Sequence, residues 1–322
     1  MTAQRSLLMV LAAGMLVVSA PARADDYPSK PVRVIVPFSA GGLNDVVGRL
    51  IADKLSEKLG KRFIAENRTG AGGVVGTEML AQAAPDGYTL GITSIANAVH
   101  PALYKLSYDP KAAFAPVAFI ASVPNVFAVK KDLPVNSVKE FIALAKSKPG
   151  QLQYASGGVG GSLHLGFELF KDKAGIDVLH VPFKGANPAV INVMGGHSDA
   201  IIGSTSSVGP HIISGKVKGI AVSAKKRSEM LPDVPTFAEA GLPGFETGNW
   251  IGLSAPAGTP PAVIEKLNKT IAAILEMPEV KKQLAARGAT ADAMTPAEFG
   301  KYIDDETKTW TGVVKSRGIK AE

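Results

Sequence analysis

The sequence predicts an α/β fold arranged as two lobes, on three observations. Residues 32–38 (VRVIVPF) form a continuous apolar, β-branched run, which is typical of a strand buried on both faces. A strand–turn–helix unit with a glycine-rich turn then recurs along the chain, and such units build mostly parallel sheets flanked by helices. Residues 258–322 show only helical patterns, which predicts helices that pack onto a sheet already formed.

The first unit shows each of its parts clearly. Residues 39–42 (SAGG) form the turn after the strand, and Asn44 or Asp45 is the natural N-cap of the helix that follows. Apolar residues then recur at helical spacing, and Gly60 ends the helix at the position that glycine favours. These apolar residues are Val47, Leu50, Ile51, Leu55 and Leu59.

Four further units follow the same pattern. Their strands are expected over residues 88–93, 152–155, 178–183 and 200–202. Residues 114–129 are also apolar, but prolines and polar residues interrupt them, which predicts extended chain rather than a membrane span.

Helix starts outside these units are marked by capping signals. Capping boxes begin at Ser137, Thr236 and Thr295, and each predicts the start of a helix. Thr259 is expected to cap a helix whose first residue is Pro260.

The order of the units predicts how the lobes are built. One sheet ends near residue 120, a second spans residues 150–225, and one more strand is expected at residues 250–255. We therefore predict that residues 25–127 and 251–322 form lobe 1 and that residues 128–250 form lobe 2. This division requires two crossings between the lobes. Proteins of this kind bind ligands in the cleft and close by a hinge.

Composition and the N-terminus narrow the class of protein. The 322 residues are 46% hydrophobic, and a net charge of +7 never gathers into a basic run, so nucleic-acid binding has no support. The absence of cysteine excludes disulfides, thiolate metal sites and thiol nucleophiles. Residues 1–24 combine Arg5, an apolar segment and a small-x-small site ending at Ala24, which predicts a cleaved signal peptide and a periplasmic protein. A membrane anchor would need a longer apolar segment.

The glycine-rich turns carry the main chemical signal. In open α/β sheets, ligands bind at the carboxyl ends of strands, where helix N-termini offer free N–H groups and a partial positive charge. Residues 39–42 and residues 156–162 (SGGVGGS) are such turns, one in each lobe. Facing each other, they would hold a small carboxylate. An equally supported interpretation is that these glycines only allow tight turns between strand and helix and bind no ligand.

Other chemistries lack their motifs. Residues 70–76 and 158–163 each miss the third glycine of the dinucleotide pattern, and neither a P-loop nor G-x-S-x-G occurs. The five histidines are scattered without H-E-x-x-H, so no metal and no cofactor are expected.

Single side chains near the turns each allow two interpretations. His164 faces a ligand or the core, and Lys184, after a strand end, meets an anionic ligand or solvent. Asp45 is expected to tie its turn together rather than act as an acid or base. Phe38 and Trp250 belong to the cleft wall or to the core.

Six motifs, in order from residue 27 onward, resemble one family. They are YPSKPVRVIVPF at 27–38, ENRTGAGG at 66–73, APDGYTL at 84–90, HVPFKG at 180–185, LPDVPT at 231–236 and APAGTP at 255–260. The chain is in this respect similar to the substrate-binding proteins of tripartite tricarboxylate transporters, also called Bug-type periplasmic receptors. The resemblance implies a two-lobe periplasmic-binding-protein (Venus flytrap) fold, with a small organic acid held between the lobes by backbone amides.

Carried onto this chain, the family's ligand contacts fall mainly on the two turns. In lobe 1 they are Phe38, Ser39, Gly41, Gly42, Asn44 and Asp45, with Ser94 at a further turn. In lobe 2 they are Ser156, Gly157, Gly158, Gly160, Ser162 and His164, and Lys184, Gly203 and Ser204 complete the predicted site. Many members carry an acidic residue where this chain has Gly203, so its absence disfavours an amino-acid ligand.

We therefore expect a monomeric receptor rather than an enzyme. It would capture a small carboxylate and deliver it to the permease subunits of a tripartite tricarboxylate transporter, or present it to a sensor kinase. The alternatives are an exported α/β enzyme acting on a small carboxylic acid, which needs a nucleophile–base pair or metal cluster in the cleft, and an orphan scaffold that binds nothing.

Overall fold

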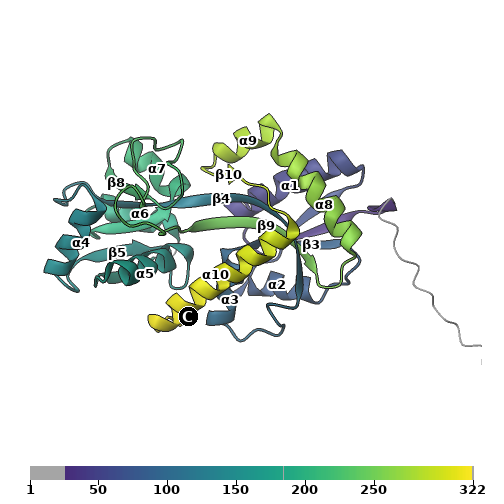
Figure 1. Ribbon diagram of the computed structural model, residues 1–322, viewed down its shortest axis with the longest axis horizontal. Coiled ribbons are helices and arrows are strands. Elements are labelled where there is room, and N and C mark those ends of the chain that lie inside the picture. Colours follow the sequence, from purple (N-terminus) through teal and green to yellow (C-terminus); the bar gives the residue numbers. More distant parts are fainter. Residues whose placement is uncertain (1–25, 184, 321–322) are drawn as a thin grey trace, which may run out of the picture.

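The computed structural model describes residues 26–183 and 185–320, and ten strands of this part form one continuous sheet. Helices lie on both sides of the sheet, and two long strands run between the two halves of the molecule (Figure 1). The predicted signal peptide lies outside the described residues. No helix of the described part has the length and apolar character needed to cross a bilayer.

Strands and helices alternate along most of the chain, as the recurring units predict. In chain order the strands are β1 Val32–Val36, β2 Phe63–Asn67, β3 Thr89–Ser94, β4 Phe114–Lys130, β5 Gln153–Ser156, β6 Leu179–Pro182, β7 Ala200–Ser204, β8 Val217–Val222, β9 Gly248–Pro256 and β10 Thr290–Ala291. The helices are α1 Leu43–Leu59, α2 Val74–Ala81, α3 Ile95–Leu103, α4 Val138–Ser147, α5 Ser162–Ala174, α6 Ala186–Met194, α7 Thr205–Ile213, α8 Pro261–Leu275, α9 Pro278–Ala285 and α10 Pro296–Ser316, and the 3₁₀ helix η2 is Ala71–Gly73.

Two kinds of strand pairing build the sheet. Its order is β2-β1-β3-β9-β4-β7-β5-β6, with β8 and β10 both paired to β4. The pairs of β1 with β2 and β3, and of β5 with β6 and β7, are parallel, as the strand–turn–helix units predict. The long strands β4 and β9 run antiparallel to their neighbours, because they form the crossings between the lobes.

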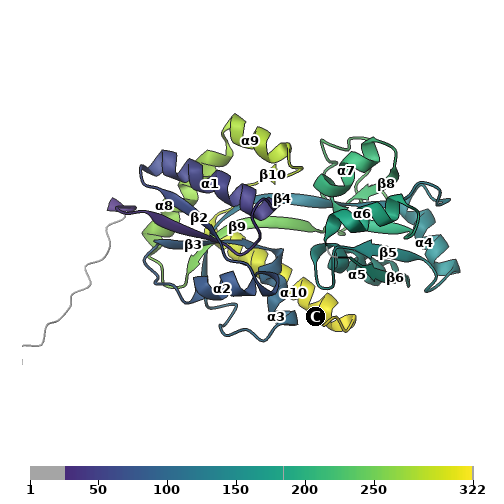
Figure 2. The same cartoon turned by 180° about the vertical axis from the view of Figure 1, so that it is seen from behind.

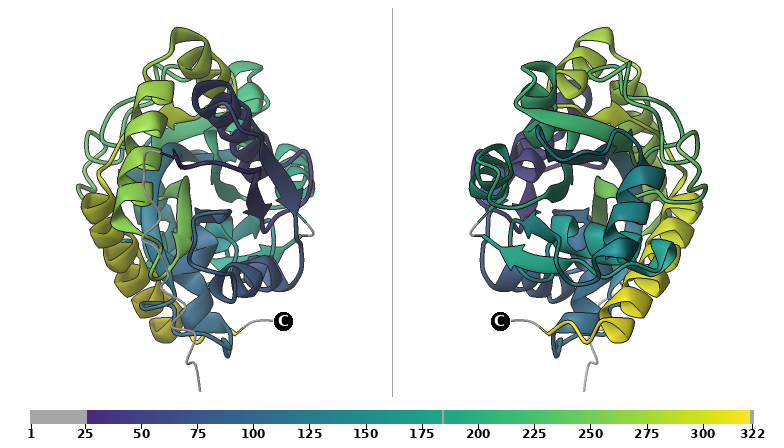
Figure 3. Two further views of the ribbon diagram at one scale, coloured as in Figure 1. Left: turned by 90° about the vertical axis from the view of Figure 1, so that its right-hand side faces the viewer. Right: turned by 90° about the vertical axis from the view of Figure 1, so that its left-hand side faces the viewer.

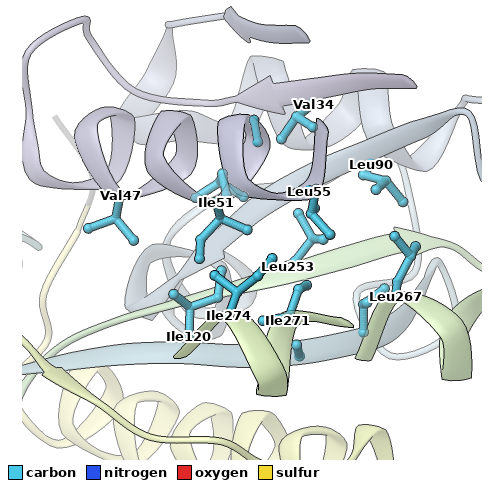
Figure 4. Packing of buried hydrophobic residues seen from close by; sticks show 14 of the residues in the cluster. Val34, Val47, Ile51, Leu55, Leu90, Ile120, Leu253, Leu267, Ile271 and Ile274 are labelled. Atoms are coloured by element: carbon cyan, nitrogen blue, oxygen red, sulfur yellow. The ribbon is translucent and has the colours of Figure 1, made fainter. Parts of the chain in front are cut away.

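Lobe 1 is organised around β1, β3 and the first part of β4. The helical spacing of α1 buries Val47, Ile51 and Leu55 against this sheet, and Ile271 of α8 joins the same cluster (Figure 4). Helices α1, α8 and α9 lie on one side of the sheet, and α2, α3 and α10 lie on the other (Figure 2). Burial of each large aliphatic side chain contributes about 1.5–3 kcal/mol, so the packed helix holds the turn before it in place.

Lobe 2 is built on a cluster of phenylalanine rings. The ring of Phe127 in β4 lies 4.9 Å from that of Phe141 in α4 and 5.1 Å from that of Phe170 in α5. On the other face of the sheet, Val190 of α6 and Val208 of α7 belong to a second buried cluster. Because helices cover both faces, residues 200–203 of the central strand β7 are all buried.

Strand β4 changes partners halfway along. Its residues up to Pro124, which lies opposite Gly248, pair with β9, and from Asn125 onward it pairs with β7. Proline lacks the N–H group that a central strand uses, so the hydrogen-bond ladder is interrupted here. The predicted lobe boundaries at 127/128 and 250/251 lie a few residues from this change of partner and remain our proposal.

The C-terminal helices follow one side of the molecule (Figure 3). Helix α10 begins with the predicted capping box, in which Thr295 N–H donates to Glu298 at 2.9 Å and Thr295 Oγ1 accepts from Glu298 N–H at 3.3 Å. At its far end, Arg317 pairs with Asp172 of α5 at 2.5 Å. The last helix therefore contacts both lobes.

The structure corrects one expected helix. Thr236 and Glu239 form their reciprocal bonds, at 2.7 and 3.1 Å, but these close only a turn. The chain cannot continue as a helix, because Gly241 has φ +89° and Pro243 follows it. The capping-box pattern here therefore belongs to a local turn, and the residues after the turn are incompatible with a helix.

Three smaller expectations are also wrong. The N-cap of α1 is Gly42, so Asn44 and Asp45 lie in the first turn. Helix α8 begins at Pro261 with Pro260 as its N-cap, one residue later than Thr259 suggested. The C-terminal region contains the short strand β10, which pairs with β4 and is too short to show a pattern in sequence.

Candidate ligand-binding site

A cavity of about 310 Å³ lies between the lobes, close to where their strand ends meet. Lobe 1 lines it with Phe38, Asn44, Gly72, Ser94, Ile95, Ala96, Val99, His100, Leu103 and Tyr104. Lobe 2 lines it with Val159, Gly160, Gly161, Ser162, Leu165 and Asn249. None of these described lining residues is a lysine, arginine, aspartate or glutamate. The volume is near the lower end of the range for small-molecule sites.

Helix α3 forms one wall of this cavity. Its N-cap is Ser94, whose Oγ accepts from the Ala96 N–H at 3.3 Å and whose N–H donates to Asn97 at 2.9 Å. Residues three and four positions apart share a helix face, so the residues from Ile95 to Tyr104 that line the cavity form a single stripe. The cavity therefore has a polar end at the helix N-terminus and a largely apolar side.

Helix α5 brings a second N-terminus to the same cavity. Its N-cap is Gly161, and no side chain of the described residues caps it. The first N–H groups of a helix have no partner within it, and they carry a partial positive charge. Because Gly161 and Ser162 line the cavity, this uncapped end lies at its edge, where it can bind an anion.

Two stacked histidines hold the turn before α5. The N–H of Gly160 donates to His164 Nδ1 at 2.9 Å, and the His164 ring stacks on His180 with centroids 4.0 Å apart. His180 Nε2 lies 2.6 Å from Ser156 Oγ, which also accepts from the Gly158 N–H at 3.2 Å. The N–H groups of Gly158 and Gly160 in this turn are thus held by the side chains of Ser156 and His164.

Burial keeps both imidazoles neutral. Burial lowers the pKa of His164, although the nearby Glu168 opposes this shift. Burial, together with the positive charge that His164 would carry, lowers the pKa of His180 to about 4. Neutral His164 can therefore keep Nδ1 unprotonated as an acceptor for the turn.

A buried carboxylate holds the turn before α1. Asp45 accepts from the N–H of Gly41 at 2.8 Å, from Arg49 at 2.9 Å and from Asn67 at 2.7 Å. Burial alone would raise the pKa of Asp45, but these hydrogen bonds together hold it below its ordinary value. Asn67 also donates to the carbonyl oxygen of Phe38 at 2.9 Å. As expected from sequence, the side chain of Asp45 ties its turn together.

The structure brings only part of the predicted site to the cavity. The predicted residues that line it are Phe38, Asn44, Ser94, Gly160 and Ser162. Those that lie in the same two turns, or in the first turn of the helix that follows, without lining it are Ser39, Gly41, Gly42, Asp45, Ser156, Gly157, Gly158 and His164. Lys184 lies outside the described residues. A role in ligand contact for all of these residues stays a prediction.

Gly203 and Ser204 serve the start of α7. Ser204 is its N-cap and accepts from the Ser207 N–H at 3.3 Å. A Cβ on Gly203 would come within 2.7 Å of a Val208 methyl group, so this strand end packs directly against the helix. Neither residue lines the cavity.

Sequence reasoning missed most of the α3 wall. Ala96, His100 and Tyr104 stand at i, i+4 and i+8 after the cap at Ser94, and this spacing could have shown that they share a face. The sequence singled out Trp250, whose side chain lies in the core, but not its neighbour Asn249. The side-chain amide of Asn249 lines the cavity and donates to Asn44 Oδ1 at 3.3 Å.

Across the described residues, no three His, Asp or Glu side chains lie close enough together to hold an ion.

Comparisons with known proteins place this architecture in a family. The model of the tripartite tricarboxylate transporter family receptor matches residues 47–319. BugT of Bordetella pertussis is 37% identical over 310 residues, 94% of each chain. The structure of Rpa4515 of R. palustris with adipate is 36% identical, with a TM-score of 0.77 over 91% of this chain and 99% of that one. MatC of Rhodopseudomonas palustris with bound malate is 34% identical, with a TM-score of 0.73 over 89% and 100%.

The chain therefore belongs to the tripartite tricarboxylate transporter family of receptors, which includes Bug-type proteins. Its fold is the two-lobe fold of periplasmic binding proteins, and its relatives are solute-binding receptors rather than enzymes.

Proposed function

We propose that this protein is a periplasmic receptor that binds a small carboxylate in the inter-lobe cavity and delivers it to a tripartite tricarboxylate transporter. The observation that carries the proposal is the pairing of two helix N-termini, of α3 and α5, at one cavity. Two relatives of known structure are described with adipate and with malate, which are carboxylates. Amides from both lobes on one anion would favour the closed state.

The proposed clamp differs in one respect from the pair of turns expected from sequence. The second turn reaches the cavity through Gly160, Gly161 and Ser162, whereas the first reaches it through Phe38 and Asn44. The positive end of the α3 dipole would then lie opposite α5, although the Ala96 N–H already donates to Ser94 Oγ. We propose that α3 and α5 hold the carboxylate and that Phe38 and Asn44 close over it.

One pair of side chains has the composition of a catalytic dyad. Ser156 Oγ lies 2.6 Å from His180 Nε2. However, Ser156 is 0% exposed and does not line the cavity, and its hydroxyl is already bonded to Gly158. A pKa of about 4 makes His180 a weak base. These features support a binding function over a hydrolytic one.

The proposed function is tested by a ligand screen on the protein without residues 1–24. We expect one class of small carboxylate to raise the Tm saturably and to remain chemically unchanged after prolonged incubation, as mass spectrometry would show. Amino acids and nicotinate-like compounds serve as comparison sets. Conversion of the bound acid would establish the enzyme alternative, and a flat screen would contradict the receptor.

The clamp is tested with two matched glycine variants. Gly161 and Gly42 are both N-caps with extended backbone, at φ −73° and −71°, so valine is allowed at either. A Cβ at Gly161 meets only the Gly158 carbonyl oxygen, at 3.5 Å, and faces open space. Gly161→Val should therefore fold and lose carboxylate binding by at least about tenfold, because its branched side chain would occupy the anion position.

Gly42→Val distinguishes the two forms of the clamp. We expect it to bind nearly normally, since Gly42 does not line the cavity. Loss of binding in both variants would show that the turns expected from sequence hold the ligand together. If Gly161→Val bound the carboxylate normally in calorimetry, the N-terminus of α5 would not be part of the clamp. Gly158 is unsuitable for this test, because its φ of +132° would strain any branched residue.

A further inference from the structure

The side chain of Leu103 in lobe 1 meets the backbone of Gly160 in lobe 2 at the cavity. Leu103 is the last residue of α3 and is partly exposed, and both residues line the cavity. A Cβ added to Gly160 would lie 2.7 Å from Leu103 Cδ1, so this methyl group already touches the glycine backbone. The two lobes are therefore in van der Waals contact at this point.

The turn before α5 is shaped to leave room for this contact. Gly160 has φ +73°, which favours glycine, and its N–H donates to His164 at 2.9 Å, which holds the turn in place. A side chain at this position would collide with Leu103. The absence of a Cβ therefore lets a side chain of lobe 1 pack directly on the turn of lobe 2.

The two sides of the contact are held by different elements. Helix α3 packs through Ala98 in a buried cluster with Trp310 of α10, and Gly160 is fixed to α5 through His164. Because Leu103 and Gly160 line the same cavity from opposite lobes, any widening of the cavity between α3 and this turn separates them.

We propose, resting on the carboxylate receptor proposed above, that the contact between Leu103 and Gly160 forms when the lobes close on the ligand and stabilises the closed state. Leu103 is then a positioning residue, which holds the turn of lobe 2 against α3 and covers the anion position at Gly161 and Ser162. Because the contact acts on closure, it strengthens the binding of every ligand by the same factor.

The first test removes the leucine side chain. Calorimetry at pH 7.5 would measure the binding of adipate, malate and benzoate. Leu103→Ala should weaken each acid that binds the wild-type protein by one common factor of about tenfold, because less apolar surface is buried on closure. The loss should appear mainly as faster dissociation, since the contact belongs to the closed complex.

The matched control for this variant is Leu169→Ala. Leu169 of α5 is also partly buried and packs against the same apolar cluster as Leu103, but it does not line the cavity. Leu169→Ala should therefore lower the Tm and keep the affinity for each acid within about twofold of the wild-type value.

The second test adds the missing Cβ. Gly160→Ala should weaken binding, because the new methyl group strains the backbone and collides with Leu103 on closure. Gly160→Ala and the double variant Leu103→Ala/Gly160→Ala share the backbone strain, so comparing them isolates the collision. We expect the double variant to bind at least as tightly as Gly160→Ala, whereas independent effects would make it about tenfold weaker. Thermal melts check that each variant folds.

The results separate this inference from the function on which it rests. Unchanged affinity with a lower Tm in Leu103→Ala would show that the contact is equally present before binding. Factors that differ among the acids would show that Leu103 acts on the ligand itself. Either result, equal weakening by Leu169→Ala, or additive effects in the double variant would overturn the inference and leave the receptor intact. Failure of these three acids and of every other acid in the ligand screen to bind the wild-type protein would overturn both.

Discussion

His164 shows how a side chain beside a ligand turn can act on the turn itself. Sequence placed it to face a ligand or the core, and in the structure it is 5% exposed and accepts a hydrogen bond from the Gly160 N–H. Gly160 has φ +73° and lines the cavity, so the bond stabilises a backbone conformation that the site needs. We infer that His164 is a positioning residue.

Two substitutions of His164 test this role. His164→Phe keeps a ring on His180 but leaves the Gly160 N–H without its acceptor, so carboxylate affinity should fall about tenfold. His164→Asn places an oxygen near the position of Nδ1 and should recover most of that loss. Calorimetry measures both, with thermal melts as a check on folding. If His164→Phe bound normally, the turn would not depend on this bond.

Residues next to local signals were the ones that sequence could predict. Phe38, Ser94 and Gly160 stand at strand ends or glycine turns, and all three line the cavity. His100 was not predicted, because its significance depends on Gly72, which reaches it from another part of the chain. Local pattern shows where a turn lies, and only packing shows which atoms surround it.

At the scale of elements, glycine has opposite meanings in β9 and α10. A Cβ on Gly252 of β9 would lie 2.7 Å from Cε1 of Phe299 and 3.0 Å from the carbonyl oxygen of Ala118. Gly312 of α10 is exposed, and a Cβ added there would have no other atom within 4 Å among the described residues. Gly252 allows α10 to pack closely on β9, whereas Gly312 has no packing role and lowers the stability of its helix.

Alanine at these two positions should therefore change stability in opposite directions. Gly312→Ala should stabilise the protein by about 0.5–1 kcal/mol, since alanine loses less backbone entropy in a helix. Gly252→Ala should destabilise it by about 1–3 kcal/mol through overpacking. Urea unfolding measures both, and a change of the same sign in the two variants would contradict this account.

Helix α10 also joins the two tryptophans of the chain. The indole N–H groups of Trp250 in β9 and Trp310 in α10 both donate to Glu306 at 3.0 Å. Burial raises the pKa of Glu306, although both indoles oppose this shift. The carboxyl group thus connects the strand that crosses between the lobes to the last helix.

At the scale of the whole molecule, three buried histidines and Glu306 make the free energy of unfolding depend on pH. Burial lowers the pKa of His100, His164 and His180, the last to about 4, against an ordinary value of 6.5. The folded state takes up these protons less readily than the unfolded chain. The contribution of these histidines to folding stability is therefore fully present above pH 6.5, and it is lost as the pH falls toward 4.

We expect the Tm to be lower at pH 5.0 than at pH 7.5. Glu306 opposes this trend, because its raised pKa gives stability that grows as the pH falls through that pKa and is complete below 4.5. Glu306→Gln removes the opposing contribution and keeps an acceptor for the indoles, so its Tm should fall more steeply over the same range. Calorimetric melts give both slopes, and an equal or shallower slope in the variant would contradict the assignment.

The sequence by itself determined the class of fold, the strand–turn–helix units and the family, because buried strands, glycine turns and helix spacing are local patterns. It also marked the turns on which the proposed site depends. Only the tertiary structure decided that α3 supplies a wall, that His100 of this wall contacts the Gly72 carbonyl oxygen, and that α10 reaches both lobes. These features arise from contacts between residues far apart in the chain, and such contacts depend on shape and burial that no local pattern contains.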